Sequence, residues 1–252
     1  MKFSVSDLLF PGFHKFDIRP LNKKYGIEFF YEFGKDYYWD EEVAVWGDRS
    51  MSIHAPCVAV DLASEADHTY LQALEQTLAY AKKINVEFVV VHTNEVGTND
   101  KATTQALVKA RLAEVLALGE KYGVTIVIEN VGLRVKNNVV FNMEEYLDIF
   151  KTFPKAKALI DTGHAHVNGW DIPAVIKALG DHLIAYHIHD NDGNADSHLP
   201  VGHGNIEWDK VFAAMRECTP NATVVCEYRI GFENTFDLEA HIEKLIAEYN
   251  LK

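Results

Sequence analysis

The chain has few cysteines, no long apolar run and no excess of positive charge, and each absence excludes a class of protein. Its 252 residues include three cysteines, Cys57, Cys218 and Cys226, without CxxC spacing, so no disulfide framework is expected. No apolar run approaches the roughly 20 residues of a membrane helix, and the N-terminus lacks the order of a signal peptide. The net charge of −13 disfavours a broad nucleic-acid-binding surface. We therefore expect a cytoplasmic protein that does not enter a membrane.

Short apolar runs alternate with amphipathic helical stretches along the whole chain, a pattern typical of a parallel sheet covered by helices. The absence of GxGxxG after the first run disfavours a dinucleotide-binding sheet. We predict an α/β fold, a single (β/α)8 TIM barrel that forms one domain over residues 1–252. The predicted strands are Lys2–Val5, Gly26–Tyr31, Met51–His54, Val86–His92, Val124–Glu129, Ala158–Asp161, Leu183–His187 and Thr223–Glu227.

One segment departs from this regular alternation. Residues 33–48 are rich in aromatic and acidic side chains and have poor periodicity. We interpret the segment as a long loop with a short helix over the barrel mouth, where the aromatic residues of Phe29–Trp39 would pack on a ligand and exclude water. Cys226 lies in an apolar run and is expected to pack in the core.

Six consecutive predicted strands end in a histidine or a carboxylate. The carboxyl ends of the strands of a parallel barrel meet at one face, so these side chains should lie together. Carboxylates alone would repel one another there, whereas a divalent ion bound by carboxylate and imidazole removes the repulsion. Histidine ligands favour Zn²⁺ or Mn²⁺, with Mg²⁺ and Co²⁺ as alternatives. The best ligands, each closing an apolar run, are Glu129, Asp161, His187 and Glu227, with His54 and His92 at the two preceding strand ends.

Further polar residues in the loops have two open interpretations. His164, and Asp196 with His198 in the glycine-rich seventh loop, are either ligands of additional metal ions or substrate contacts. Arg229, just past the eighth strand, is expected to meet a phosphate or carboxylate. Four residues are predicted to orient the ligands: His189, Asp190, Asp192 and His203. Four histidines are predicted to lie on the surface: His14, His68, His182 and His241.

Together these motifs resemble the xylose isomerase-like TIM barrel superfamily from Gly26 to the end of the chain. The motifs that carry the resemblance are Ser52–Pro56, Val91–Asn94, Ile128–Asn130, Asp161–His164, His187–Asp190, Asp196–His198 with Gly202–Gly204, and Cys226–Glu227. The superfamily contains sugar and sugar-phosphate isomerases and epimerases, and also nucleases of the endonuclease IV type that cut DNA at abasic sites.

The resemblance assigns roles that differ between these branches. In the single-metal sugar epimerases the matching ligands are Glu129, Asp161, His187 and Glu227, the two glutamates are also the acid/base pair, and His164 contacts substrate. In endonuclease IV the same four residues and five more hold three zinc ions. The five matching positions here are His54, His92, His164, Asp196 and His198. The ligand set alone does not separate the branches.

Other features favour the sugar branch. The chain lacks the Gly-x-His opening of the nuclease, its first part is short, and no cluster of arginine and lysine follows the strand ends. We therefore predict a metal-dependent isomerase or epimerase of a sugar or sugar phosphate, which removes a proton next to a carbonyl through Glu129 and Glu227. His164 and His198 would hold substrate hydroxyls. A zinc phosphodiesterase and a ligand-binding barrel without turnover are the alternatives, and a homo-oligomer is left open.

Overall fold

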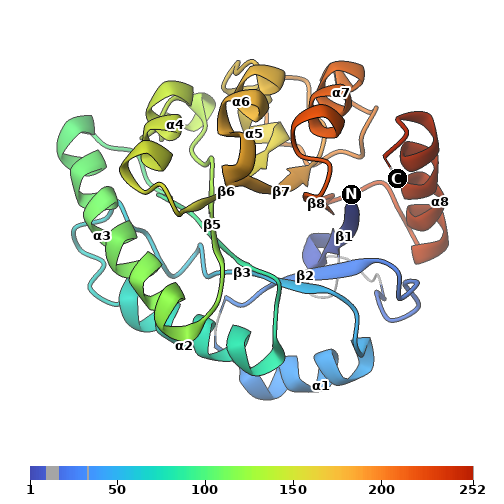
Figure 1. Cartoon of the computed structure of the whole chain (residues 1–252), viewed down its shortest axis with the longest axis horizontal. Coiled ribbons are helices and arrows are strands. Elements are labelled where there is room, and N and C mark those ends of the chain that lie inside the picture. Colours follow the sequence, from blue (N-terminus) through green and yellow to red (C-terminus); the bar gives the residue numbers. More distant parts are fainter. Residues whose placement is uncertain (10–16, 33, 252) are drawn as a thin grey trace.

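The strands pair in parallel, each with its neighbour along the chain, and β1 closes the ring on β8. The computed structural model describes residues 1–9, 17–32 and 34–251. Figure 1 shows the strands surrounded by a ring of helices, as predicted for a (β/α)8 barrel. The strands are β1 (Lys2–Ser6), β2 (Gly26–Phe30), β3 (Met51–His54), β4 (Val89–Val91), β5 (Ile126–Glu129), β6 (Lys157–Asp161), β7 (Leu183–Ile188) and β8 (Thr223–Cys226).

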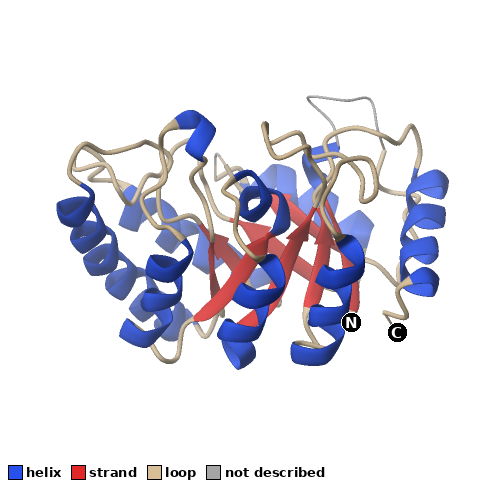
Figure 2. Ribbon diagram, turned by 90° about the horizontal axis from the view of Figure 1, so that it is seen from above, coloured by secondary structure: helices blue, strands red, loops and turns tan. Residues whose placement is uncertain are grey.

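The helices lie outside the strands, between the strands that they connect in sequence (Figures 1 and 2). Several begin at side-chain caps: Asn142 and Glu145 form a capping box, and Asn234 accepts from the backbone N–H of Asp237. Helix α3 ends at Gly123, which has a φ of +70° that suits glycine. The helices are α1 (Asp36–Trp46), α2 (Tyr70–Ile84), α3 (Lys101–Tyr122), α4 (Met143–Thr152), α5 (Thr162–Val167), α6 (Ile172–Leu179), α7 (Trp208–Cys218) and α8 (Thr235–Glu248).

Two apolar layers enclose each strand. Outward residues pack against the helices in the main core, whereas a smaller separate cluster lies within the ring of strands. Because side chains alternate along a strand, the residue two positions after each member of this inner cluster also points inward, toward the carboxyl ends. The inner cluster is Phe88, Val90, Val127, Leu159, Ala185 and Val225. Two positions after the last five come His92, Glu129, Asp161, His187 and Glu227.

The prediction for residues 33–48 is wrong in its placement. Instead of a short helix over the mouth, the chain forms α1, an eleven-residue member of the outer ring. Trp39 and Trp46 pack on Phe29, with ring centroids 4.4 and 5.5 Å away. Phe29 points outward because Glu28, its neighbour, points into the barrel. Trp39 and Trp46 therefore form an α1–β2 core contact, Tyr37 and Tyr38 are exposed, and Phe30 lines the site.

Cys226 is buried in β8, as predicted. No helix among the described residues is both long and apolar enough to cross a bilayer.

Candidate metal centre

Three carboxylates surround one nitrogen of His187. Its Nδ1 lies 3.5 Å from Glu129 Oε2, 3.5 Å from Glu227 Oε2 and 3.9 Å from Asp161 Oδ2. This nitrogen is buried and has no hydrogen-bond partner among the described residues. Two ligand atoms about 2.1 Å from one ion stand roughly 3.0–3.5 Å apart, so the spacing suits a shared divalent cation. The donor set of one imidazole and three carboxylates thus fits a metal ion of the predicted kind.

Glu28 orients the ring of His187. Its Oε1 lies 2.7 Å from His187 Nε2, and its Oε2 accepts a 2.8 Å hydrogen bond from Ser52 Oγ. Glu28 and His187 are fully buried. Because Nε2 is engaged by a carboxylate, Nδ1 is the nitrogen that faces the three acidic ligands. The sequence prediction missed Glu28, which stands inside a strand rather than at its end.

Asp161 and the short helix after it bring His164 into the same site. Asp161 caps α5, since its Oδ1 accepts a 2.7 Å hydrogen bond from the backbone N–H of His164. One turn of helix then directs His164 back toward Glu129, with Nδ1 3.2 Å from Oε1. Asn130 holds Asp161 from the neighbouring strand by pairing with its backbone N–H and carbonyl.

The remaining predicted ligands gather around this centre. His54 Nε2 and His92 Nε2 lie 3.1 Å apart, and His92 Nε2 is 3.1 Å from Glu129 Oε2. On the other side, Asp196 Oδ2 lies 3.4 Å from His164 Nε2 and 3.2 Å from His198 Nε2. His198 Nδ1 is 3.5 Å from Glu227 Oε2. The structure therefore brings all nine predicted ligand positions into one contiguous cluster.

The surroundings of the two central glutamates shift their pKa values in opposite directions. Burial by itself would raise the pKa of Glu129, but the charges of His92 and His187 hold it well below its usual range. Burial and the carboxylates of Asp161 and Glu129 raise the pKa of Glu227 to about 8, against the opposing effect of His187. The two glutamates are thus placed in opposite environments, a pattern typical of acid/base pairs.

His189 contacts Asp161 and His198 of the cluster. Its Nε2 lies 3.0 Å from Asp161 Oδ2, and its buried ring stacks on His198 with centroids 3.9 Å apart. Gly163 leaves room for this ring, because a Cβ at position 163 would overlap it.

We expect Gly163→Ala to lower the free energy of unfolding by roughly 1–3 kcal/mol, because the added methyl group must displace a fully buried ring. Urea denaturation measures this change. The double variant Gly163→Ala/His189→Ala should recover part of the loss by removing the overlapping ring. A single variant as stable as the wild type would contradict the packing described.

Asp7 adds a titrating group behind Glu28. Burial, with a smaller contribution from the charge of Glu28, raises the pKa of Asp7 from 3.8 to about 7, although the N–H of Phe30 donates to it. A carboxyl whose pKa is raised on folding contributes stability that is complete below its unfolded pKa and is lost as the pH rises through the folded value.

Asp7→Asn should therefore gain stability relative to the wild type as the pH rises from 4 to 7, by at most about 1.4 kcal/mol per pH unit. The asparagine remains neutral and can still accept from Phe30. The check is the difference in free energy of unfolding between variant and wild type at pH 5 and pH 8. A difference independent of pH would mean that Asp7 is not perturbed.

The cluster lines a pocket of about 240 Å³ at the carboxyl ends of the strands. Phe30, Leu133, Lys136 and Asn138 are among the other residues of its wall. Arg229 is exposed and is not among the residues that line it, so the structure does not bring it to the site with the other predicted residues. Lys136, also exposed, is the lysine or arginine among the described residues that line the pocket.

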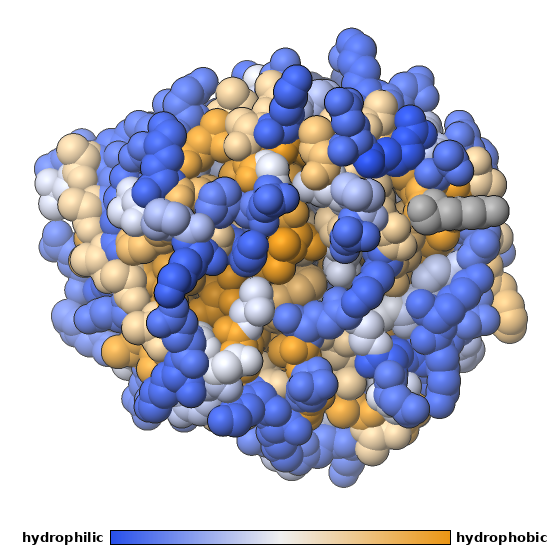
Figure 3. Space-filling model, viewed as in Figure 1, coloured by the Kyte–Doolittle hydropathy of each residue, from blue (hydrophilic) through white to orange (hydrophobic). Residues whose placement is uncertain are grey.

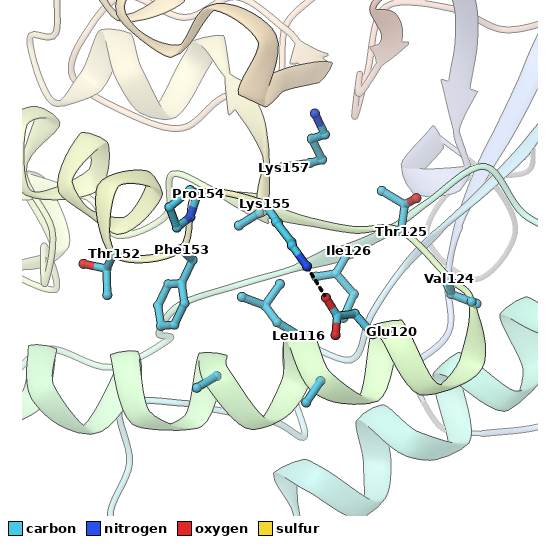
Figure 4. Close-up of a pocket in the computed structure, with 15 residues that line it drawn as sticks. Leu116, Glu120, Val124, Thr125, Ile126, Thr152, Phe153, Pro154, Lys155 and Lys157 are labelled. Carbon is cyan, nitrogen blue, oxygen red and sulfur yellow. Dashed lines mark ion pairs between the residues drawn. The ribbon is translucent and has the colours of Figure 1, made fainter.

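A larger hollow of about 680 Å³ lies elsewhere, between α3 and the starts of β5 and β6. Figure 4 shows Leu116, Ile126 and Phe153 around it, with Glu120 and Lys155 paired at its edge. In Figure 3 hydrophobic residues are visible in the hollowed part of the face shown, between hydrophilic residues around it. Its lining contains no histidine or cysteine, so it offers no comparable chemistry.

The residues predicted to orient the ligands divide into two pairs. His189 contacts Asp161, and buried Asp190 organises the seventh loop by accepting from Trp208 Nε1 and the N–H of Gly202. Asp192 and His203 are exposed.

Of the histidines predicted to lie on the surface, one is exposed and two are half-buried. His68 is exposed, whereas His182 and His241 are half-buried and hydrogen-bonded to Ala156 and Tyr228. Each packs beside an aromatic ring, which helical spacing alone did not reveal. His14 lies outside the described residues.

Residues 26–247 match the model of the family described as xylose isomerase-like TIM barrel. The chain belongs to this family. Among curated proteins, this xylose isomerase-like barrel is 27% identical over 249 residues to an uncharacterized protein of Methanocaldococcus jannaschii, covering 86% of this chain and 80% of the relative.

Solved structures of similar fold include one with a zinc atom and one with a bound sugar. The IolI protein with a zinc atom has a TM-score of 0.80 at 18% identity, covering 99% of this chain and 98% of IolI. The D-allulose 3-epimerase of Methylomonas sp. in complex with D-allulose has a TM-score of 0.78 at 16% identity, covering 99% and 97%. At these identities the likeness concerns the fold of the xylose isomerase-like barrel.

Proposed function

We propose that the protein is a divalent-metal-dependent isomerase or epimerase that acts on a sugar or sugar phosphate. The observation that carries the proposal is the unpartnered Nδ1 of His187 facing Glu129, Asp161 and Glu227 at the carboxyl ends of the strands. A Mn²⁺ or Zn²⁺ ion bound there would polarise a substrate carbonyl and acidify the adjacent C–H. Membership of the family and the sugar-bound epimerase of similar fold support the same conclusion.

Glu129 and Glu227 are the proposed acid/base pair. They approach His187 Nδ1 from different strands, so each would reach the carbon next to the carbonyl from its own side. One glutamate takes the proton, which leaves an enediolate, and the other returns a proton to the same or the neighbouring carbon.

The pocket suggests how the rest of the substrate is held. A volume of about 240 Å³ is suited to a small molecule rather than to a duplex. His164 and His198 point into it from opposite sides of Asp196 and would hold hydroxyl groups. We propose that Lys136, rather than Arg229, meets the anionic group of a phosphorylated or acidic sugar, because Lys136 is the one that lines the pocket.

A panel of ketoses and ketose phosphates, incubated in D₂O with Mn²⁺- or Zn²⁺-loaded protein and followed by proton NMR, tests the proposal. We expect metal-dependent exchange of a proton next to the carbonyl and the appearance of an isomer. No exchange with any member, by protein that retains about one ion per chain, would contradict it.

The second candidate function is zinc-dependent cleavage of DNA at abasic sites. The observation that favours it is the assembly of His54, His92, His164, Asp196 and His198 around the four central ligands. Elemental analysis separates the two candidates. Two or three zinc ions per chain, reduced in His54→Ala, together with cutting of an abasic duplex would support the nuclease. One ion per chain in Mn²⁺-loaded protein, unchanged in His54→Ala, would support the sugar enzyme.

A further inference from the structure

A second group of metal-binding side chains lies on the outer side of His92. One ligand atom each of Cys57, His92 and Glu95 lies within 4.8 Å of the others. Glu95 Oε1 is 2.5 Å from His92 Nδ1. The three residues follow the ends of β3 and β4, at the mouth of the barrel, and none is fully buried, so ions can reach them from solvent.

The turn that carries Cys57 is held by a carboxylate from the preceding loop. Glu32 accepts hydrogen bonds from three successive backbone N–H groups, those of Cys57 at 3.0 Å, Val58 at 2.6 Å and Ala59 at 2.8 Å. This carboxylate therefore fixes the backbone of Cys57 just after the end of β3. The thiol can then act as a ligand without a change in the conformation of the loop.

The loop that carries Glu95 is fixed as well. Asn138 donates to the carbonyl of Glu95 at 2.8 Å, and Asp61 accepts from the N–H of Val96 at 3.2 Å. The Asp61 contact joins this loop to the loop that carries Cys57, so the two loops hold the three ligand atoms within 4.8 Å of one another.

The outer group shares His92 with the central cluster, and His92 and Glu95 both line the central pocket, but the group uses another atom of His92 and another set of ligands. His92 directs Nε2 inward to Glu129 and His54, and Nδ1 outward to Glu95. A cation beside Glu95 would therefore use Nδ1, on the opposite side of the ring from the centre. The central ligands carry oxygen and nitrogen, whereas the outer group adds a sulfur ligand, which selects softer cations.

We propose that Cys57, His92 and Glu95 form a separate outer site for a soft or borderline divalent cation such as Zn²⁺ or Cd²⁺. One thiolate, one imidazole and one carboxylate leave a fourth tetrahedral position for water. The ion binds with release of the thiol proton to solvent, and the ring proton of His92 resides on Nε2, directed at Glu129. Hard cations such as Mn²⁺ and Mg²⁺ bind this group poorly, so protein loaded with Mn²⁺ keeps the outer group free for a softer cation.

Titration of Mn²⁺-loaded protein with Cd²⁺, followed by thiolate-to-metal charge-transfer absorption in the ultraviolet, tests the site. We expect the band to saturate at about one Cd²⁺ per chain, to vanish in Cys57→Ala and to persist in Cys218→Ala, the matched control at the other partly exposed thiol. In Glu95→Gln the band should remain but require at least about tenfold more Cd²⁺.

Absence of the band in the wild type, its persistence in Cys57→Ala or its loss in Cys218→Ala would overturn the proposal. Unchanged Mn²⁺ content and far-ultraviolet circular dichroism establish that Cys57→Ala is folded. If Cys57→Ala does not fold, the weaker Cd²⁺ binding expected of Glu95→Gln tests the site instead, and unchanged Cd²⁺ binding in that variant would overturn the proposal. No substrate is needed, so the outcome is independent of whether the protein acts on sugars.

Discussion

Replacing Glu129 with glutamine is expected to lower turnover by at least about a thousandfold, within the range that a general acid/base group contributes. Glu129 is the residue on which the cluster converges: its two oxygens lie 3.1–3.6 Å from nitrogens of His54, His92, His164 and His187. The amide retains the shape of the side chain but removes both the negative charge and the ability to take a proton. The measurement is steady-state turnover of the sugar found by the NMR panel, with metal content determined on the same samples.

The matched control is Glu87→Gln. Glu87 is also a strand-end glutamate, but it precedes β4 at the opposite face, where it pairs with Lys2. Its variant should keep both turnover and metal. If Glu129→Gln retained near-normal turnover, the acid/base assignment would fail, and if it lost turnover while keeping metal, Glu129 would act on the proton more than on the ion.

Replacing Glu28 with glutamine is expected to weaken binding of the central metal by about ten- to a hundredfold, the usual effect of altering a partner behind a metal-bound histidine. The charge of Glu28 is coupled to His187 through a 2.7 Å contact with Nε2. A neutral amide at position 28 would make the imidazole of His187 less basic. It would also hold the ring less firmly, because glutamine can offer Nε2 either a donor or an acceptor.

Isothermal titration with Mn²⁺ or Zn²⁺ measures this effect, and urea denaturation without added metal reports whether the fold itself has changed. Ser52→Ala is the graded control, since it removes the hydrogen bond behind Glu28 but keeps the carboxylate. We expect Ser52→Ala to weaken binding less than Glu28→Gln. Equal metal affinity in Glu28→Gln and wild type would show that Glu28 is only a packing residue.

Much of the fold follows from local sequence, because buried parallel strands read as apolar runs and each is separated from the next by a helix-length stretch. The prediction failed at α1 since Trp39 and Trp46 pack against Phe29, and such tertiary packing leaves no regular period in a segment full of acidic and aromatic residues. Aromatic residues near a strand end do not by themselves distinguish a ligand wall from a helix contact.

The site was predictable where a polar residue closes an apolar run. His187 and Asp161 are examples, although their roles as ligands stay predictions. Glu28 was missed because a single carboxylate inside an apolar strand gives no sign of its partner, which lies 159 positions away in the sequence. Arg229 was predicted from its place after the eighth strand, but nearness to a strand end along the chain does not fix where a long exposed side chain points.

The two-residue step between the inner apolar layer and the proposed ligands has a consequence for how this chain can diverge. Insertion or deletion of one residue between Val127 and Glu129, or between Ala185 and His187, would turn the acidic or imidazole side chain toward the helices and an apolar one toward the ion. Changes of length are therefore tolerable in the loops that precede the strands, at the face opposite the site, but not within these strands. Descendants of the sequence that keep the chemistry should differ in the length of those loops while conserving the count of residues in each strand.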